Sequence, residues 1–179
     1  MTDAILRVDE ADISDRMLQH SEVTSNLILD MGRYLDSKRG NRALAARTDI
    51  DPTELVPALP YMVLVDIHTN PLRVFYRLVG TKIAEFYGEF TGTWMHERPL
   101  SNAYRRIAEN IYLALVQTRQ PVFGITETRT RWGAVVSYEW GYFPLSADGV
   151  NVTAGLEIES PDRPIVGLNA PAVTLQRRA

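Results

Sequence analysis

The sequence predicts an α+β fold, in which an antiparallel sheet packs against helices. Three observations support this class. Two runs that alternate in polarity surround a turn within residues 59–79, a long amphipathic helical pattern occupies residues 101–119, and three more alternating runs follow it. The expected order is therefore a leading helix, two strands, a helical segment and three antiparallel strands.

Composition limits the size and the class of the protein. A chain of 179 residues with 45% hydrophobic residues suits one domain with an extension. The net charge of -3 provides no basic field, so we expect no nucleic-acid partner. The absence of cysteine excludes disulfides and thiolate chemistry. Because no signal peptide and no apolar run of about 18 residues is visible, we expect a cytoplasmic protein without a membrane partner.

Residues 22–38 predict an amphipathic helix near the start of the chain. Apolar residues recur there at helical spacing, and Gly40 follows a basic last turn. Two roles stay open for this helix, namely packing against the sheet and dimerisation or signalling. Residues 1–15 are expected to be loosely ordered or to form a short helix. Further along, Asp51 predicts the capped start of a short helix over residues 52–58.

Residues 59–79 predict a β-hairpin with one packed face and one solvated face. Apolar residues alternate with other residues on both sides of a turn at residues 69–71. After the second strand, Thr81 predicts the N-cap of a short helix over residues 82–87, which Gly88 ends. A hairpin that leads into a short helix beside a sheet is typical of small sensory domains that enclose a pocket.

The second half of the chain predicts one long helix and three strands. The helix over residues 101–119 has the clearest pattern in the sequence, with Ser101 or Asn102 as its cap. Alternation predicts strands over residues 122–130, 134–145 and 150–159. The expected turns are Arg131-Trp132-Gly133 and Ala147-Asp148-Gly149, the second a tight hairpin. In the last strand, Glu157 and Glu159 fall on the face opposite the apolar residues.

Several short stretches over residues 22–159 matter through their order and spacing, because no single one of them is specific. They are Thr48-Asp49-Ile50-Asp51-Pro52, Leu59-Pro60, Asp66-Ile67, Tyr76-Arg77-Leu78-Val79-Gly80-Thr81, Thr91-Gly92 and Pro144-Leu145-Ser146-Ala147-Asp148-Gly149. Together with the order of elements, these stretches resemble the PAS sensor-domain superfamily, and in particular a bacterial family of small single-PAS-domain proteins.

The resemblance implies a PAS-like five-stranded antiparallel sheet with helices packed on one face, an N-terminal helical extension and a small internal cavity. We expect the helical extension and connector over residues 1–58, the PAS domain over residues 59–160 and a C-terminal tail over residues 161–179. The resemblance implies no particular ligand, because PAS domains bind haem, flavin, carboxylic acids, lipids or nothing. The cofactor therefore stays unknown.

Aromatic residues concentrate in the predicted domain, and three interpretations stay open for them. They form a packed core, or they line a ligand pocket together with Arg105 or Arg106, or those of residues 138–143 form a sheet face that binds the leading helix of another subunit. The predicted ligand-binding residues are Tyr76, Phe86, Tyr87, Trp94, Met95, Tyr104, Ile107, Tyr112, Tyr138 and Trp140.

No catalytic or metal-binding residue is predicted. The three histidines lie far apart and lack the spacing of metal ligands. His96 precedes the long helix, so it is a candidate axial haem ligand if it faces the cavity.

We therefore expect a sensory or regulatory protein, not an enzyme, that binds a small molecule or a signalling partner. It would have no output domain of its own, form a homodimer and act on a separate signalling protein. One alternative is a small α+β enzyme with a hot-dog-like or cone-like cavity. The loose candidates for its catalytic groups are Asp66, Glu85, His96 and Glu97. Another alternative is a ligand-free PAS module used for interaction or dimerisation.

Overall fold

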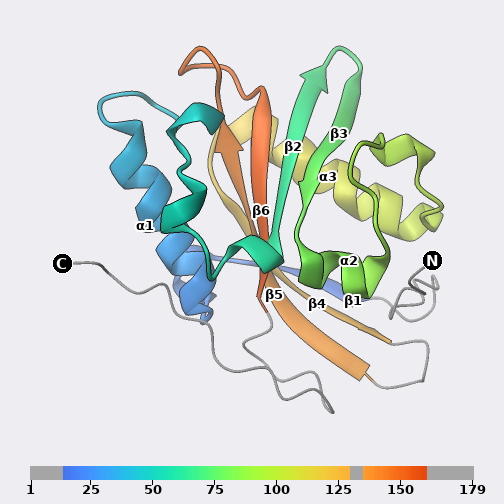
Figure 1. Cartoon of the computed structure of the whole chain (residues 1–179). Coiled ribbons are helices and arrows are strands. Elements are labelled where there is room, and N and C mark those ends of the chain that lie inside the picture. The colour runs from blue at the N-terminus through green and yellow to red at the C-terminus, as the bar shows by residue number, and fades with distance from the viewer. Residues whose placement is uncertain (1–13, 130–134, 161–179) are drawn as a thin grey trace.

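A computed structural model describes residues 14–129 and 135–160 of the chain. These residues form a six-stranded sheet in the order β1-β4-β5-β6-β2-β3, and every neighbouring pair is antiparallel (Figure 1). The strands are β1 (Ser14–Leu18), β2 (Met62–Thr69), β3 (Leu72–Val79), β4 (Val122–Arg129), β5 (Val135–Leu145) and β6 (Ala154–Ser160).

Three α-helices and several short 3-10 turns complete the described part of the chain. The helices are α1 (Asn26–Arg39), α2 (Thr81–Tyr87) and α3 (Asn102–Thr118). The 3-10 turns are η2 (His20–Glu22), η3 (Arg47–Asp49), η4 (Pro52–Glu54), η5 (Leu59–Tyr61) and η6 (Met95–Glu97). The two longer helices begin at serine caps, because Ser25 accepts a hydrogen bond from the Ile28 amide and Ser101 accepts one from the Tyr104 amide.

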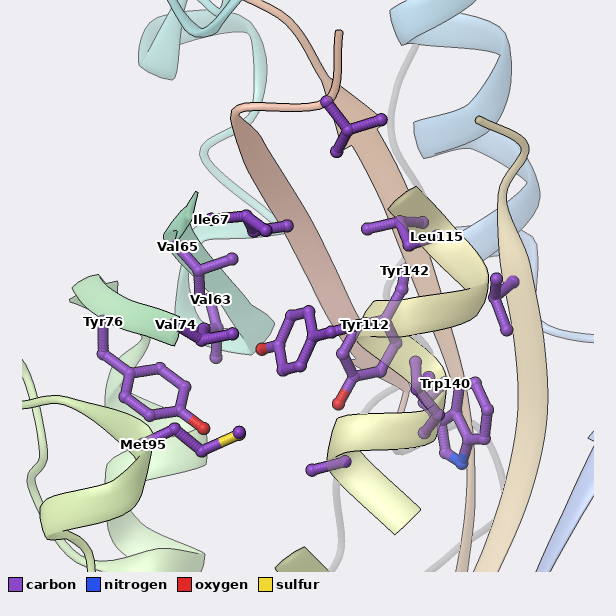
Figure 2. Packing of buried hydrophobic residues seen from close by; sticks show 14 of the residues in the cluster. Val63, Val65, Ile67, Val74, Tyr76, Met95, Tyr112, Leu115, Trp140 and Tyr142 are labelled. Carbon is purple, nitrogen blue, oxygen red and sulfur yellow. The ribbon is translucent and has the colours of Figure 1, made fainter. Parts of the chain in front are cut away.

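Helices cover both faces of the sheet, so the core has two apolar layers (Figure 1). On the outer face, Leu27 and Ile28 of α1 pack with Phe143 of β5. On the opposite face, called the inner face below, α3 packs with strand residues such as Val65 and Tyr142. Figure 2 shows the side chains of this inner layer between the strands and α3. Strands β5 and β6 are therefore buried on both sides.

The predicted α+β, PAS-like fold is confirmed, with one strand more than expected. Strand β1 pairs with β4 from Ser14 opposite Glu127 to Leu18 opposite Phe123. The expectation of a loose segment or short helix is therefore wrong from Ser14 onward, while residues 1–13 lie outside the described residues. Only Leu18 of this short strand is buried, so its sequence shows no alternation, and its pairing with β4 makes it a strand.

The structure places α1 on the outer face, so helices cover both faces of the sheet. The resemblance implied helices on one face only. The leading apolar residues of α1 pack against the sheet, which confirms the packing role; a signalling role stays a prediction. Among the described residues, no helix combines the length and the apolar content that crossing a bilayer requires.

Smaller differences concern the ends of elements. The helix predicted over residues 52–58 is only the turn η4, although Asp51 caps it as expected by accepting from the Thr53 amide. Thr81 is the first residue of α2 and Gly80 is its N-cap. Strand β6 begins at Ala154, because the preceding residues form a loop held by Asp148.

The Asp148 carboxylate holds this loop by accepting hydrogen bonds from the amides of Val150 and Asn151, which lowers its pKa. A wider loop thus replaces the predicted tight hairpin. The predicted turn at residues 131–133 and the predicted tail over residues 161–179 lie outside the described residues.

Candidate functional site

A small pocket lies on the inner face between α3 and the strands. Its volume is about 20 Å³, enough for one water molecule. The pocket is lined by Asp15, Tyr104, Ile107, Ala108, Ile111, Thr126, Tyr138, Trp140, Tyr142 and Glu159. Aromatic rings and two carboxyl groups therefore surround a space of the size of one small polar group.

Asp15 brings the first carboxyl group to the pocket from the edge strand β1. Its Oδ1 accepts hydrogen bonds from the Thr126 hydroxyl at 2.6 Å and from Nε1 of Trp140 at 3.1 Å. Burial raises the pKa of Asp15, and these two hydrogen bonds oppose the rise. The strand that sequence patterning did not predict thus supplies an acidic group and fixes the indole of Trp140.

Glu159 of β6 is the second carboxyl group in the pocket wall. The Tyr87 hydroxyl, from α2, hydrogen-bonds to it and also contacts the hydroxyl of Tyr138. Burial raises the pKa of Glu159 well above its usual range, and the neighbouring charge of Glu157 acts in the same direction. Glu159 therefore favours its neutral form while the pocket holds no compensating positive charge.

Glu157 lies two residues earlier on the same face of β6 and is 6% exposed. The Tyr112 hydroxyl lies 3.4 Å from its Oε2, and Tyr142 also hydrogen-bonds to it. Figure 2 shows Tyr112 and Tyr142 reaching the same interior region from α3 and β5. Burial raises the pKa of Glu157 to about 7, and these hydrogen bonds and the charge of Arg98 limit the rise. Glu157 is therefore poised to gain or lose a proton near neutral pH.

Arg98 supplies the positive charge of this cluster and is 9% exposed. Its guanidinium carbon lies 3.6 Å from the centroid of the Phe90 ring and 5.3 Å from that of Tyr76. Arg98 also donates a hydrogen bond to the Tyr76 hydroxyl oxygen. The positive charge of Arg98 acts on both Glu157 and Glu159, although Arg98 itself does not line the pocket.

Most of the predicted ligand-binding residues come together on the inner face. Tyr104, Ile107, Tyr138 and Trp140 line the pocket, and Tyr87 packs against the adjoining core. Tyr76, Met95 and Tyr112 belong to this core (Figure 2). Their role in ligand binding stays a prediction. The aromatic residues of β5 also separate as period two requires, because Tyr142 faces the inner layer and Phe143 the outer layer.

Trp94 lies apart from the pocket. It packs on the side chains of β3 that point away from the inner face. The guanidinium carbon of Arg73 is 4.0 Å from its ring centroid, and the Phe75 ring is 5.0 Å away. His96 is exposed, with its ring 6.1 Å from that of Trp94, so its placement gives no support to a cavity-facing haem ligand. Phe86, on α2, is half-buried and is not part of the pocket wall.

The two arginines predicted as polar tips of the pocket do not reach it. Arg106 is exposed, and Arg105 donates to the carbonyl oxygen of Arg98 at 3.3 Å. The buried guanidinium belongs instead to Arg98, in the segment between η6 and α3, where no sequence pattern marked a site.

The loose candidates for an enzyme do not converge either. Asp66 forms an ion pair with Arg77 of the neighbouring strand β3. Glu85 pairs with Lys82 on the surface of α2, and Glu97 accepts a hydrogen bond from the Trp94 amide. Among the described residues, no three acidic or histidine side chains gather in a way that suits a metal ion.

The acidic groups of the site were missed because β6 is covered on both faces. Alternation correctly separated Glu157 and Glu159 from the apolar side of the strand, but that side faces α1, and the other side is covered by α3. The available signal was a pair of carboxyls at positions i and i+2 in an otherwise apolar strand that follows a strand rich in aromatic residues.

A comparison with known families agrees with this architecture. The sequence profile of the family described as PAS domain matches residues 23–156, well over half of the chain. The match begins just before α1 and ends within β6. No curated protein matches the chain. The chain therefore belongs to the PAS domain family.

Proposed function

We propose that the protein is a PAS sensory or regulatory module that binds a small molecule in the pocket on the inner face. PAS domains are generally sensor modules rather than enzymes, and the family suggests a sensory or regulatory role. The proposal adds a place for the ligand. It rests on one observation, the pair of carboxyls of Glu157, which is buried, and Glu159, which is half-buried, among tyrosine hydroxyls.

This pair supports a function because it is unfavourable for folding alone. Removing a charge from water costs several kcal/mol per ion after relaxation, and a packed apolar core of the same volume is often at least as stable. If both carboxyls ionise, the one nearby guanidinium leaves one negative charge uncompensated, so a proton on one of them or a further positive charge is favoured. A site that is destabilising until something binds is suited to sensing.

The contacts of Tyr87 offer a route from the pocket to the surface. Tyr87 belongs to α2, and its hydroxyl contacts both Glu159 and Tyr138 in the pocket wall. In the proposal, a ligand that hydrogen-bonds to Glu159 or Tyr138 replaces the contact of the Tyr87 hydroxyl with that residue, and α2 loses a contact that fixes its position. A movement of α2 would shift Lys82 and Glu85 on its exposed side, and a partner protein that contacts these residues would detect the shift.

We also propose that the protein works as a homodimer that passes its signal to a separate signalling protein. Among the described strands, β1 forms one edge of the sheet, and its Met17 is 50% exposed. An exposed edge strand is a ready template for pairing with a second chain. Light scattering after size-exclusion chromatography tests the dimer, and Met17→Asp should shift it toward the monomer.

Retention of a small molecule tests the main proposal. The purified chain is analysed by native mass spectrometry, and its thermal stability is measured with a library of metabolites. Tyr104→Phe and Tyr138→Phe keep the rings but remove hydroxyls at the pocket, so both should weaken retention. Tyr61→Phe is the matched control, because Tyr61 packs in the outer layer. The absence of both a bound mass and any stabilising compound would refute the proposal.

A further inference from the structure

We propose that the ligand of this pocket is a small organic ammonium ion, held between Asp15 and Glu159 and against the surrounding aromatic rings. This inference rests on the proposed function, because it names the chemical class of ligand for the same pocket. Three features carry it: the charge of the wall, the arrangement of the rings and the size of the space.

The wall of the pocket is acidic. Asp15 and Glu159 are its acidic residues, and no lysine, arginine or histidine is among its described lining residues. Both hydrogen bonds that Asp15 accepts from described side chains reach its Oδ1, so no described side chain donates to Oδ2. The N–H groups of an ammonium ion are donors for these carboxylate oxygens, and its charge would favour the ionised forms of both acids.

The rings suit a cation as well. Trp140 and Tyr142 both line the pocket, and their rings meet at an interplanar angle of 86° with their centroids 5.3 Å apart. Tyr104 and Tyr138 complete the aromatic lining. The negative face of an aromatic ring attracts a cation, and tryptophan does so most strongly. Aromatic cages are a recurring means by which proteins bind quaternary ammonium groups.

Other classes of ligand fit less well. An anion would meet two carboxyls, while the buried guanidinium of Arg98 stacks on Phe90 and Tyr76 and is not part of the pocket wall. A metal ion would need a third ligand, and no such group of three gathers among the described residues. A neutral ligand would bring no positive charge to stabilise the ionised forms of Asp15 and Glu159, whose pKa values burial raises.

The pocket is large enough only for a small ammonium group. About 20 Å³ accommodates one non-hydrogen atom with its hydrogens, such as the nitrogen of an ammonium group. Tyr104 and Tyr138 are only half-buried, so a short alkyl chain on that nitrogen would leave the pocket on their side. Methylammonium and ethylammonium are therefore the first compounds to test.

Isothermal titration calorimetry on the full chain at pH 8 tests the inference. Methylammonium chloride and ethylammonium chloride should bind, whereas sodium chloride, sodium acetate and acetamide should not. Glu159→Gln and Asp15→Asn remove one acid each at nearly constant shape, and each should weaken binding at least tenfold. Glu127→Gln is the matched control, because Glu127 is an exposed acid on β4, and it should change the affinity less than twofold. Circular dichroism confirms that each variant is folded.

A second readout separates ionic binding from general salt effects. Because a bound cation favours ionised carboxyls, methylammonium binding should release protons, and its affinity should fall at least tenfold between pH 8 and pH 5. Equal binding of sodium and methylammonium, or unchanged affinity in both acid variants, would overturn the inference. Binding of acetate or acetamide in place of the amines would overturn it and leave the proposed function intact. If none of these compounds binds and no library compound does, both proposals fail.

Discussion

The Glu139 carboxylate accepts a hydrogen bond from the Thr24 hydroxyl at 2.6 Å, although 115 positions separate the two residues in the chain. The same carboxylate accepts from the backbone amides of Thr24 and Ser25 at 2.9 Å. These three bonds join the start of α1 to the outer face of β5 and place a negative charge at a helix N-terminus, where it is stabilising. The helix on the outer face is thus held by a buried polar contact as well as by its apolar side.

We expect Glu139→Gln to lower the free energy of unfolding by about 1–3 kcal/mol, because an amide cannot accept all three hydrogen bonds as a carboxylate does. Urea denaturation at pH 7 measures the change. Glu127→Gln, on the neighbouring strand β4 and exposed, should stay within roughly 0.5 kcal/mol of the unchanged protein. Equal effects of the two variants would show that the contact with α1 contributes nothing.

Glu157 should make the protein less stable as the pH rises. Its pKa is raised from 4.5 to about 7 in the folded state, so the folded state binds more protons than the unfolded state between these values. The stability it contributes is present below about pH 4.5 and is lost as the pH rises through 7. Glu157→Gln should remove about 3 kcal/mol of this pH dependence, by the linkage between a pKa shift and stability.

Urea denaturation at several values between pH 5 and pH 8 measures this effect. At pH 8 the Glu157→Gln variant should be the more stable protein, since it carries no buried charge at that position. Glu159 has the same sign of shift, so the double variant should flatten the profile further. A variant that keeps the original slope would show that Glu157 does not titrate in this range.

Arg98→Gln should be more harmful at high pH than at low pH. The positive charge of Arg98 acts on Glu157, so its removal leaves the Glu157 carboxylate without that compensation. Losing the compensating partner of a buried charge costs up to about 3–5 kcal/mol. At pH 8 that charge is on Glu157, whereas at pH 5 this carboxyl is protonated and the loss reduces to the packing of the guanidinium on Phe90. Thermal unfolding at both pH values measures the difference. Arg106→Gln, at an exposed position of α3, is the control and should show no such dependence.

Gly124→Ala should displace the indole of Trp140. A Cβ atom at Gly124 would lie 2.0 Å from Cζ2 of Trp140, closer than any real contact, so the ring has to move. We expect a loss of about 1–3 kcal/mol in stability and a changed near-UV circular dichroism spectrum. Gly32→Ala provides the control, because its Cβ would meet Phe143 only at 3.4 Å, and alanine raises helix stability by up to about 1 kcal/mol. An unchanged spectrum in Gly124→Ala would contradict the packing of Trp140.

Local sequence signals identified much of the fold. Caps at Asp51 and Ser101, the glycine after α2 and the apolar spacing of α1 and α3 are properties of short stretches of chain, and each was found where expected within a few residues. The hairpin of β2 and β3 was equally clear. The aromatic residues of β5 separate onto two faces, since the side-chain direction of a strand alternates strictly, but which face is covered by which helix was not visible in the sequence.

The candidate site was only half visible in the sequence. Its aromatic lining could be anticipated, because large rings concentrated in the domain. Its charged groups could not, since Asp15 belongs to a strand that exists through its pairing with β4 and Arg98 follows a single turn of 3-10 helix. Trp94 was placed in the predicted pocket by its position in the chain alone, and the structure sets it on the other side of β3.

The sequence by itself determined most of the helices and strands and which of their side chains share a face, because these depend on period, caps and turn residues a few positions apart. Strand β1 is the exception, because it depends on its pairing with β4. Only the tertiary structure decided what covers each face. Alternation in β6 shows that Glu157 and Glu159 lie opposite its apolar residues, but it does not show that α3 closes over them. Burial depends on elements distant in the chain, and it is burial that turns two ordinary carboxyls into a site.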